Sequence, residues 1–284
     1  MKRKGALALA EASSTAAAER ASGSSFYNAM RILPRAQRAA MFEIYSFCRQ
    51  VDDIADASGP RDARREQLER WRADIDALYA GSPSAAAQGL VLPVREFGLR
   101  REDFHAIIDG MEMDVVADVR APDEATLDLY CDRVASAVGR LSVRVFGMEE
   151  RSGLELAHHL GRALQLTNIL RDLDEDAAVG RLYLPAQALR AAGICATDPL
   201  PVLASPAVGG VCADIVGRAR GHFALADAIM TRSPRRTVRA PRIMAEAYLA
   251  ILDRLVERGW SCPRPSIHLP RARLLWIIMR HAFI

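Results

Sequence analysis

Asp52, Asp53 and Asp56 form an Asp-Asp-x-x-Asp cluster at the end of a segment with helical spacing. On a helix, Asp52 and Asp56 share one face with their Cβ atoms about 5–6 Å apart, whereas Asp53 is rotated by about 100°. Two carboxylates this close repel each other unless a cation lies between them. A solvated last turn is one interpretation, but negative charge is unfavourable at a helix C-terminus. Three aspartates there therefore favour a bound cation.

A second polar cluster consists of Gln165, Asn168, Asp172 and Asp176, at successive spacings of three, four and four residues. These spacings draw one polar stripe along a helix whose other positions are strongly apolar. Such a stripe is expected to face the interior of a helical bundle, where metal sites are built from side chains on facing helices. A charged, solvated last turn is the alternative.

The two clusters together indicate Mg²⁺ rather than a transition metal. Mg²⁺ prefers oxygen ligands and is commonly held by one or two carboxylates plus substrate phosphates. No Cys/His set with zinc spacing competes, because His158 and His159 are adjacent and no Cys-x-x-Cys pair occurs. Two acidic helices that face each other across an apolar cavity predict a hydrophobic diphosphate as the substrate.

The elements that must position these side chains are all predicted to be helices. Apolar residues at helical spacing predict a helix over 37–56, and a polar amphipathic helix is predicted over 62–80. No segment shows sustained apolar-polar alternation, so the predicted fold is an all-α bundle. Further helical patterns cover 86–97, 102–117, 123–145, 151–176, 184–192, 204–231 and 240–258.

Length and composition restrict the class of protein. Half of the 284 residues are hydrophobic, which permits a sizeable core. We expect a disordered leader over 1–20 and a single domain over 21–284. The net charge of +3 is spread among interspersed acids and bases, which argues against nucleic acid as a partner. The five scattered cysteines fit reduced cytoplasmic thiols, and no apolar run reaches the length of a membrane span.

The sequence resembles the squalene and phytoene synthases of the isoprenoid-synthase fold from about Ser22 to Tyr248. Both acidic clusters fall within the resemblance, in the expected order and spacing. Within the family it is most similar to bacterial members that make presqualene diphosphate for hopanoid biosynthesis. The other matching blocks are Ser24-Ser25-Phe26-Tyr27, Leu33-Pro34-Arg35, Tyr45-Ser46-Phe47-Cys48-Arg49, Tyr130-Cys131, Gln165 through Asp172 and Gly180-Arg181-Leu182-Tyr183-Leu184-Pro185.

The resemblance implies a helical bundle with a central apolar cavity and a Mg²⁺-dependent prenyltransferase activity. The implied reaction joins two farnesyl diphosphates head to head, gives presqualene diphosphate and releases diphosphate. Phytoene synthase and full squalene synthase are the alternatives, and a non-catalytic scaffold relative is a remote one. The implied metal ligands are Asp52, Asp56, Asn168, Asp172 and Asp176. The implied substrate contacts are Ser24, Ser25, Tyr45, Arg49, Gln165, Arg171 and Tyr248, and Arg171 is also implied to act in catalysis.

Arg133 departs from the pattern of the eukaryotic squalene synthases, which carry a second tyrosine soon after the Tyr-Cys block. In those enzymes the tyrosine is associated with later proton handling, so its absence implies that the reaction stops at presqualene diphosphate. Arginine stays charged at accessible pH. In the cavity, its charge would disfavour a second carbocation by about 4 kcal/mol at 4 Å for an effective dielectric near 20.

The C-terminal region places arginines beside an apolar, Trp-containing helix that includes Trp276. Helices of this kind can lie in a bilayer interface. Two interpretations follow: a terminal helix packed on the bundle, which is slightly favoured, and peripheral contact with the inner face of the membrane.

Overall fold

The computed structural model describes residues 30–116 and 119–283 of the chain. The predicted leader over 1–20, together with Ser24 and Ser25, lies outside the described residues. Within those residues the secondary structure is helical without a named strand, and the one β-bridge joins Arg120 to Leu182. The all-α prediction is therefore confirmed.

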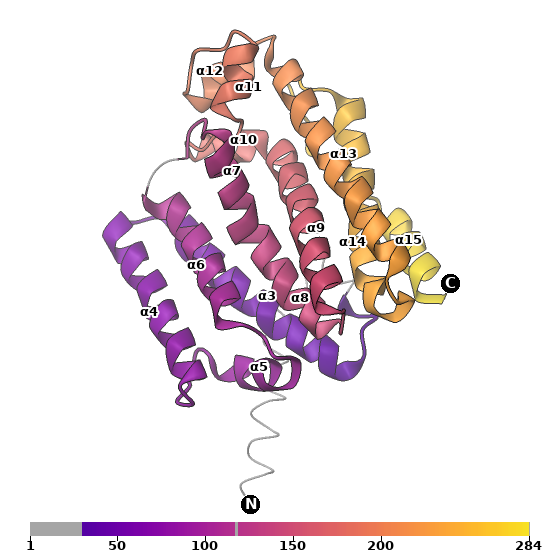
Figure 1. Cartoon of the computed structure of the whole chain (residues 1–284). Coiled ribbons are helices and arrows are strands. Elements are labelled where there is room, and N and C mark those ends of the chain that lie inside the picture. The colour runs from indigo at the N-terminus through magenta and orange to yellow at the C-terminus, as the bar shows by residue number, and fades with distance from the viewer. Residues whose placement is uncertain (1–29, 117–118, 284) are drawn as a thin grey trace, which may run out of the picture.

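The helices follow one another along the chain with short connections (Figure 1). The first half comprises α3 (Arg35–Asp56), α4 (Arg61–Tyr79), α5 (Val91–Phe97), α6 (Arg101–Val116), α7 (Glu124–Cys131) and α8 (Ala137–Val145). The second half comprises α9 (Glu150–Arg171), α10 (Leu173–Ala178), α11 (Ala186–Ala191), α12 (Pro199–Ala204), α13 (Val208–Arg232), α14 (Arg235–Arg258) and α15 (Arg271–Phe283). A 3₁₀ turn, η1 (Gln88–Leu90), precedes α5, and a π-helical turn, η2 (Asp132–Ser136), joins α7 to α8.

Three predicted helices differ from those observed. The helix predicted over 151–176 breaks at Asp172, whose backbone (φ −99°, ψ 18°) ends α9 and begins α10. The helix predicted over 123–145 contains the π-helical turn η2. The helix α14 begins at Arg235, five residues before the predicted start, because it continues through Pro241. A proline inside a helix usually marks a boundary, which is why the sequence pattern missed the first turn.

Helix α9 is the centre of the bundle, with α8, α13 and α14 packed against it (Figure 1). On the other side of the molecule α3 packs on α6 and α8, and α4 packs on α6. Phe47 of α3 is fully buried there, with its ring edge-on to Trp71 and to Phe104 at centroid distances of 5.2 Å. Aromatic packing of this kind fixes α3, and with it the first acidic cluster, against its neighbours.

Small residues let η2 and α8 approach α9 closely. A Cβ atom built on Gly161 of α9 would lie 2.7 Å from Cα of Ser136, and one on Gly139 would lie 3.1 Å from Cα of Ala157. Either side chain would push the helices apart. Glycine at these two positions therefore sets the spacing of the helices that frame the centre of the bundle.

Within the described residues, the structure contains no helix with the length and hydrophobicity needed to cross a bilayer.

Candidate active site

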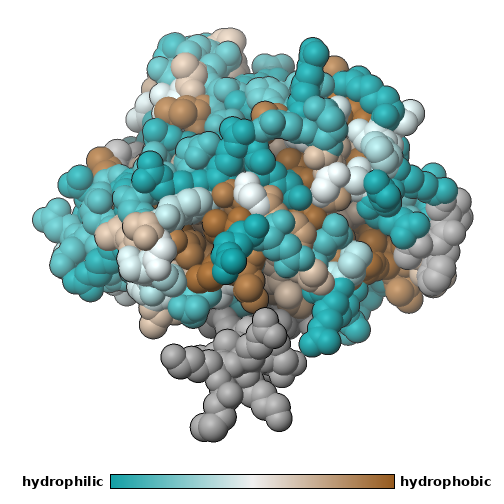
Figure 2. All heavy atoms as spheres, turned by 60° about the horizontal axis from the view of Figure 1, so that its bottom comes forward, coloured by the Kyte–Doolittle hydropathy of each residue, from teal (hydrophilic) through white to brown (hydrophobic). Residues whose placement is uncertain are grey.

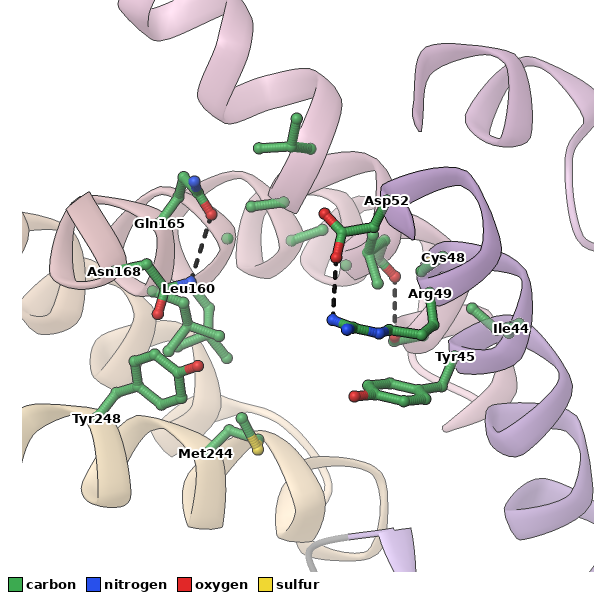
Figure 3. A pocket seen from close by; sticks show the side chains of 18 of the residues that line it. Ile44, Tyr45, Cys48, Arg49, Asp52, Leu160, Gln165, Asn168, Met244 and Tyr248 are labelled. Carbon is green, nitrogen blue, oxygen red and sulfur yellow. Dashed lines mark hydrogen bonds and ion pairs between the residues drawn. The ribbon is translucent and has the colours of Figure 1, made fainter. Parts of the chain in front are cut away.

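A cavity of about 540 Å³ lies between α3, α8, α9 and α14, within the size range of small-molecule sites. Figure 3 shows side chains of α3 facing side chains of α9 and α14 across this space. Much of the wall is apolar, with Ile44, Leu160 and Met244 among the lining residues. The polar side chains gather where α3 and α9 end.

Every predicted site residue within the described part of the chain lines this cavity. Those from α3 and α14 are Tyr45, Arg49, Asp52, Asp56 and Tyr248. Those from α9, α10 and the break between them are Gln165, Asn168, Arg171, Asp172 and Asp176. Asp53, which the helical spacing rotates away, does not line the cavity, and its carboxylate pairs with Nε of Arg49 at 3.1 Å.

Negative charge accumulates at the end of the cavity. Burial, followed by the nearby charge of Asp56, raises the pKa of Asp52 to about 6. Burial, followed by the charge of Asp172, raises the pKa of Asp176 to about 7. Both shifts mean that the neighbouring cations do not fully compensate the carboxylates.

An unsatisfied oxygen lies at the same place. Asn168 uses its amide N–H to donate to Oε1 of Gln165 at 3.4 Å, while its buried Oδ1 has no hydrogen-bond partner. No group of three or more His, Cys, Asp or Glu side chains in the described chain already converges as a metal site. The donors instead stand in two sets on facing elements. Surplus carboxylates and an unpaired amide oxygen are donors of the kind that Mg²⁺ takes, so this end of the cavity fits a divalent cation.

Three arginines line the carboxylate end. Arg49 pairs with Asp52 at 3.2 Å, and Arg171 forms two hydrogen bonds of 2.6 Å with the carboxylate of Asp172. The third, Arg181, follows α10 and donates to Oδ1 of Asp56 at 2.8 Å. Guanidinium groups suit phosphate oxygens because several N–H donors lie in one plane.

Sequence patterns did not assign a role to a buried cluster on the cavity wall, formed by Asp114, Tyr130 and Tyr183. The Tyr130 hydroxyl donates to Oδ2 of Asp114 at 3.0 Å, and the Tyr183 hydroxyl donates to Oδ1 at 2.7 Å. The two rings are stacked with centroids 4.8 Å apart. Burial, together with the charge of Asp114, holds the pKa of Tyr130 well above its usual value, so the phenol stays protonated.

Helical periodicity could not find this cluster, because its members come from α6, α7 and the segment after α10. The blocks that contain Tyr130, Tyr183 and Arg181 appear in the family resemblance. That resemblance was the available signal.

Arg133 does not line the central cavity, so the expected repulsion of a second carbocation inside it is wrong. Its guanidinium lies 3.9 Å from Oδ2 of Asp109, and the residue borders a separate depression beside α6. The physical reason is helical spacing: Val134 lies four residues after Tyr130 and lines the cavity with it, whereas Arg133 is turned toward α6.

Comparison with known proteins agrees with this architecture. The sequence model of the squalene/phytoene synthase family matches residues 19–273, and the chain belongs to this family. It is 62% identical to a presqualene diphosphate synthase from Rhodopseudomonas palustris, over 92% of this chain and 94% of the relative. It is 57% identical to one from Sinorhizobium fredii over the same shares. A phytoene synthase from Thermus thermophilus is 32% identical, over 88% of this chain and 85% of the relative.

The fold has a solved counterpart in the crystal structure of a dehydrosqualene synthase. The two structures superpose with a TM-score of 0.83 and 20% sequence identity, over 96% of each chain. At this level of identity the likeness concerns the fold.

Proposed function

We propose that this protein is a prenyltransferase that joins two farnesyl diphosphates head to head, yielding presqualene diphosphate and free diphosphate, in the route to squalene and hopanoids. The observation that carries the proposal is the cavity. Its apolar wall ends in two sets of carboxylates on facing elements, and three arginines pair with them. An amphiphile with a prenyl chain and a diphosphate head matches this division. The names of the most similar relatives support the same product.

The arginines bind and orient the two diphosphate groups. Arg49, Arg171 and Arg181 donate charge-assisted hydrogen bonds to phosphate oxygens, in exchange for the carboxylates that they contact now. Mg²⁺, held by Asp52, Asp56, Asn168, Asp172 and Asp176, would act when bound as a Lewis acid and template for the diphosphates.

The reaction begins when one farnesyl diphosphate breaks its C–O bond and leaves an allylic cation and free diphosphate. The allylic double bond of the second farnesyl chain attacks the cation, and loss of a proton then closes a cyclopropane ring. The apolar wall excludes water, which would otherwise quench the cation. Tyr130 stays a neutral phenol, so the released diphosphate is the stronger base for the proton.

Product analysis tests this proposal directly. Purified protein with Mg²⁺ receives either farnesyl or geranylgeranyl diphosphate, with and without NADPH, and the products are identified by mass spectrometry. We expect presqualene diphosphate from the farnesyl substrate. Phytoene-type product from the geranylgeranyl substrate, or squalene formed as fast as the cyclopropane when NADPH is present, would select one of the alternatives. Absence of any condensation would indicate a non-catalytic relative, although the acidic residues expected to be lost in such a protein are all present.

We also propose that the enzyme works in the cytoplasm and contacts the inner face of the membrane peripherally through α15. The widely spaced cysteines, all free thiols, support a reducing compartment.

A further inference from the structure

Helix α15 presents two different apolar faces. Leu274, Ile277 and Ile278 pack against the core, and Ile277 is fully buried. On the other side Leu275, Trp276 and Met279 are exposed, with 57%, 45% and 51% of their surface accessible. Positions i, i+1 and i+4 lie within about 100° on a helix. These three side chains, the α15 stripe, therefore form one continuous apolar strip that is about half exposed.

Arginines border the α15 stripe. The guanidinium groups of Arg273 and Arg280 lie 4.7 and 5.4 Å from the centre of the Trp276 ring, and both side chains are about half exposed, at 50% and 52%. Their aliphatic stems thus extend the apolar surface while their charged heads mark its edge. An apolar strip flanked by basic residues and containing tryptophan is the composition of helices that lie in a bilayer interface.

The charge of the chain is concentrated in the same region. Residues 228–284 contain 11 arginines and three acidic residues, a net charge of +8, whereas the whole chain has +3. The first 227 residues are therefore net negative. Such an asymmetry indicates an anionic partner for the C-terminal part.

Three of these arginines are exposed at the start of α14: Arg235, Arg236 and Arg239. None of them forms an ion pair with a described residue, and positive charge is unfavourable at a helix N-terminus. Arg235 and Arg239 share a helix face with Glu246 (i, i+4, i+11), which meets Arg280 and His281 of α15. The arginines of the α14 start therefore continue the surface that α15 begins.

The relation of the two helices can be followed in Figure 1. Figure 1 shows α14 and α15 side by side, with the start of α14 at the lower end of the bundle and the C-terminus nearby. Figure 2, which brings that lower end forward, shows hydrophobic residues in patches between hydrophilic ones.

We propose that the α15 stripe and the α14 start together form a docking face for an anionic lipid bilayer. The stripe enters the boundary between headgroups and acyl chains, and the arginines contact anionic headgroups. The inference rests on the proposed function in one respect, since prenyl substrate and product are themselves lipids. The opposite face of α14 supplies Ala240, Pro241 and Met244 to the cavity wall. One helix therefore separates the apolar part of the cavity from the docked bilayer.

Co-sedimentation of the full chain with vesicles tests the docking face. The probes are phosphatidylcholine vesicles with and without 30% phosphatidylglycerol, at low and high salt. We expect binding that requires phosphatidylglycerol and weakens with salt. Neutralising the α14 start should lower the partition coefficient on the order of a hundredfold, and a polar α15 stripe should lower it about tenfold or more. The two variants are Arg235→Gln/Arg236→Gln/Arg239→Gln and Leu275→Ser/Trp276→Ser/Met279→Ser.

Matched controls change the same chemistry elsewhere. Arg70, Arg95 and Arg190 are exposed arginines on other helices, and Leu92, Leu200 and Leu225 are exposed leucines. Both control variants should bind vesicles as the unmodified chain does. The controls are Arg70→Gln/Arg95→Gln/Arg190→Gln and Leu92→Ser/Leu200→Ser/Leu225→Ser.

Three results would overturn the proposal. These are no binding by the unmodified chain, equal binding to both kinds of vesicle, and equal binding by the docking variants and the controls. A concentration-dependent dimer that only the stripe variant loses would assign the face to a second copy of the chain. Turnover of detergent-dispersed farnesyl diphosphate, measured on the same samples, separates the two proposals. Lost vesicle binding with intact turnover in the variants supports docking, whereas an unmodified chain that binds vesicles without turnover contradicts the proposed function alone.

Discussion

A comparison of two groups of arginines and carboxylates in the bundle shows a difference in how well their charges are matched. The first surrounds Arg162 of α9, whose side chain is 6% exposed. Its guanidinium binds both oxygens of Asp128 at 2.7 and 2.9 Å and also reaches Asp132 and the hydroxyl of Ser136. The pKa of Asp128 is lowered, first by the hydrogen bond from Arg162. We call this group the Arg162 network, and it is closed in the sense that each of its carboxylates pairs with a guanidinium.

The second group lies at the carboxylate end of the cavity. It is open in the sense that its charges and hydrogen-bonding groups are not all paired. There the pKa values of Asp52 and Asp176 are raised rather than lowered, and the amide oxygen of Asn168 is buried without a partner. The lowered pKa is typical of a charge in a structural ion pair, and the raised pKa values in a cavity are typical of a ligand-binding site. The comparison indicates that the carboxylates around Arg162 are matched by a cation, whereas the buried carboxylates at the end of the cavity keep negative charge that a cation and a substrate would relieve.

The largest effect should come from removing a charge of the open group. In Asp52→Asn or Asp172→Asn, we expect turnover to fall on the order of a thousandfold, because an amide cannot supply the charge that holds a divalent cation. The fold should survive, since one repelling carboxylate is gone. Steady-state kinetics and circular dichroism check both statements. Asp128→Asn, in the Arg162 network, is the matched control and should keep its turnover; near-normal activity of the cavity variants at saturating Mg²⁺ would remove the basis of the mechanism.

The free energy of unfolding should depend more on the Arg162 network than on the open group, which is the reverse of the effect on turnover. Arg162→Met removes the hydrogen bonds to Asp128, Asp132 and Ser136, while Asp132 keeps Arg140, and we expect a loss of about 2 kcal/mol in the free energy of unfolding. Arg49→Met in the cavity removes a half-exposed ion pair, which contributes less than about 1 kcal/mol. Urea unfolding compares the two variants. Equal losses would show that the closed and open groups do not differ energetically.

The open group also predicts how stability depends on pH. Asp52 and Asp176 have pKa values near 6 and 7 in the metal-free folded state, against an ordinary value of 3.8. Between about pH 4 and pH 7 the folded state binds more protons than the unfolded state, so these groups lower the free energy of unfolding as the pH rises. Their favourable contribution is fully present below about pH 4 and lost above about pH 7.

Mg²⁺ should therefore compete with protons. We expect a saturating Mg²⁺ concentration to raise Tm by about 5 °C at pH 8 and by much less at pH 5. Thermal unfolding at both pH values measures the difference. Asp176→Asn should abolish the gain, and an equal gain at both pH values would contradict a carboxylate site.

The sequence was most informative where chemistry follows helical spacing. Asp52 and Asp56 share a face of α3 as predicted, and Asn168 and Asp172 face them from the end of α9. The break at Asp172 was not predictable, because an acidic residue at this position continues a helical pattern as well as it ends one. Arg181 and Tyr183 were missed for a different reason. They follow a short helix, and only tertiary packing brings them to α3 and α6.

Arg133 is the residue whose expected place in the cavity was wrong. The expectation came from the family resemblance, whereas helical spacing puts Val134, four residues after Tyr130, on the cavity face. Arg133 consequently faces Asp109 of α6, while Val134 faces the cavity. A charge that the sequence placed beside the reacting carbons lies outside the cavity.

The smallest effect should therefore come from Arg133→Tyr, which restores the residue type of the eukaryotic squalene synthases. The new phenol would lie in the depression beside α6 and would not reach the cavity. We expect turnover within about twofold of the unmodified enzyme and no gain of squalene when NADPH is added. Val134→Tyr is the matched control, because Val134 lines the cavity and a larger side chain there should obstruct the substrate. Mass spectrometry of both variants decides the point. If Arg133→Tyr converts presqualene diphosphate to squalene, the side chain at this position acts on the second half-reaction despite its place outside the cavity. Product choice would then depend on residues outside the open group as well.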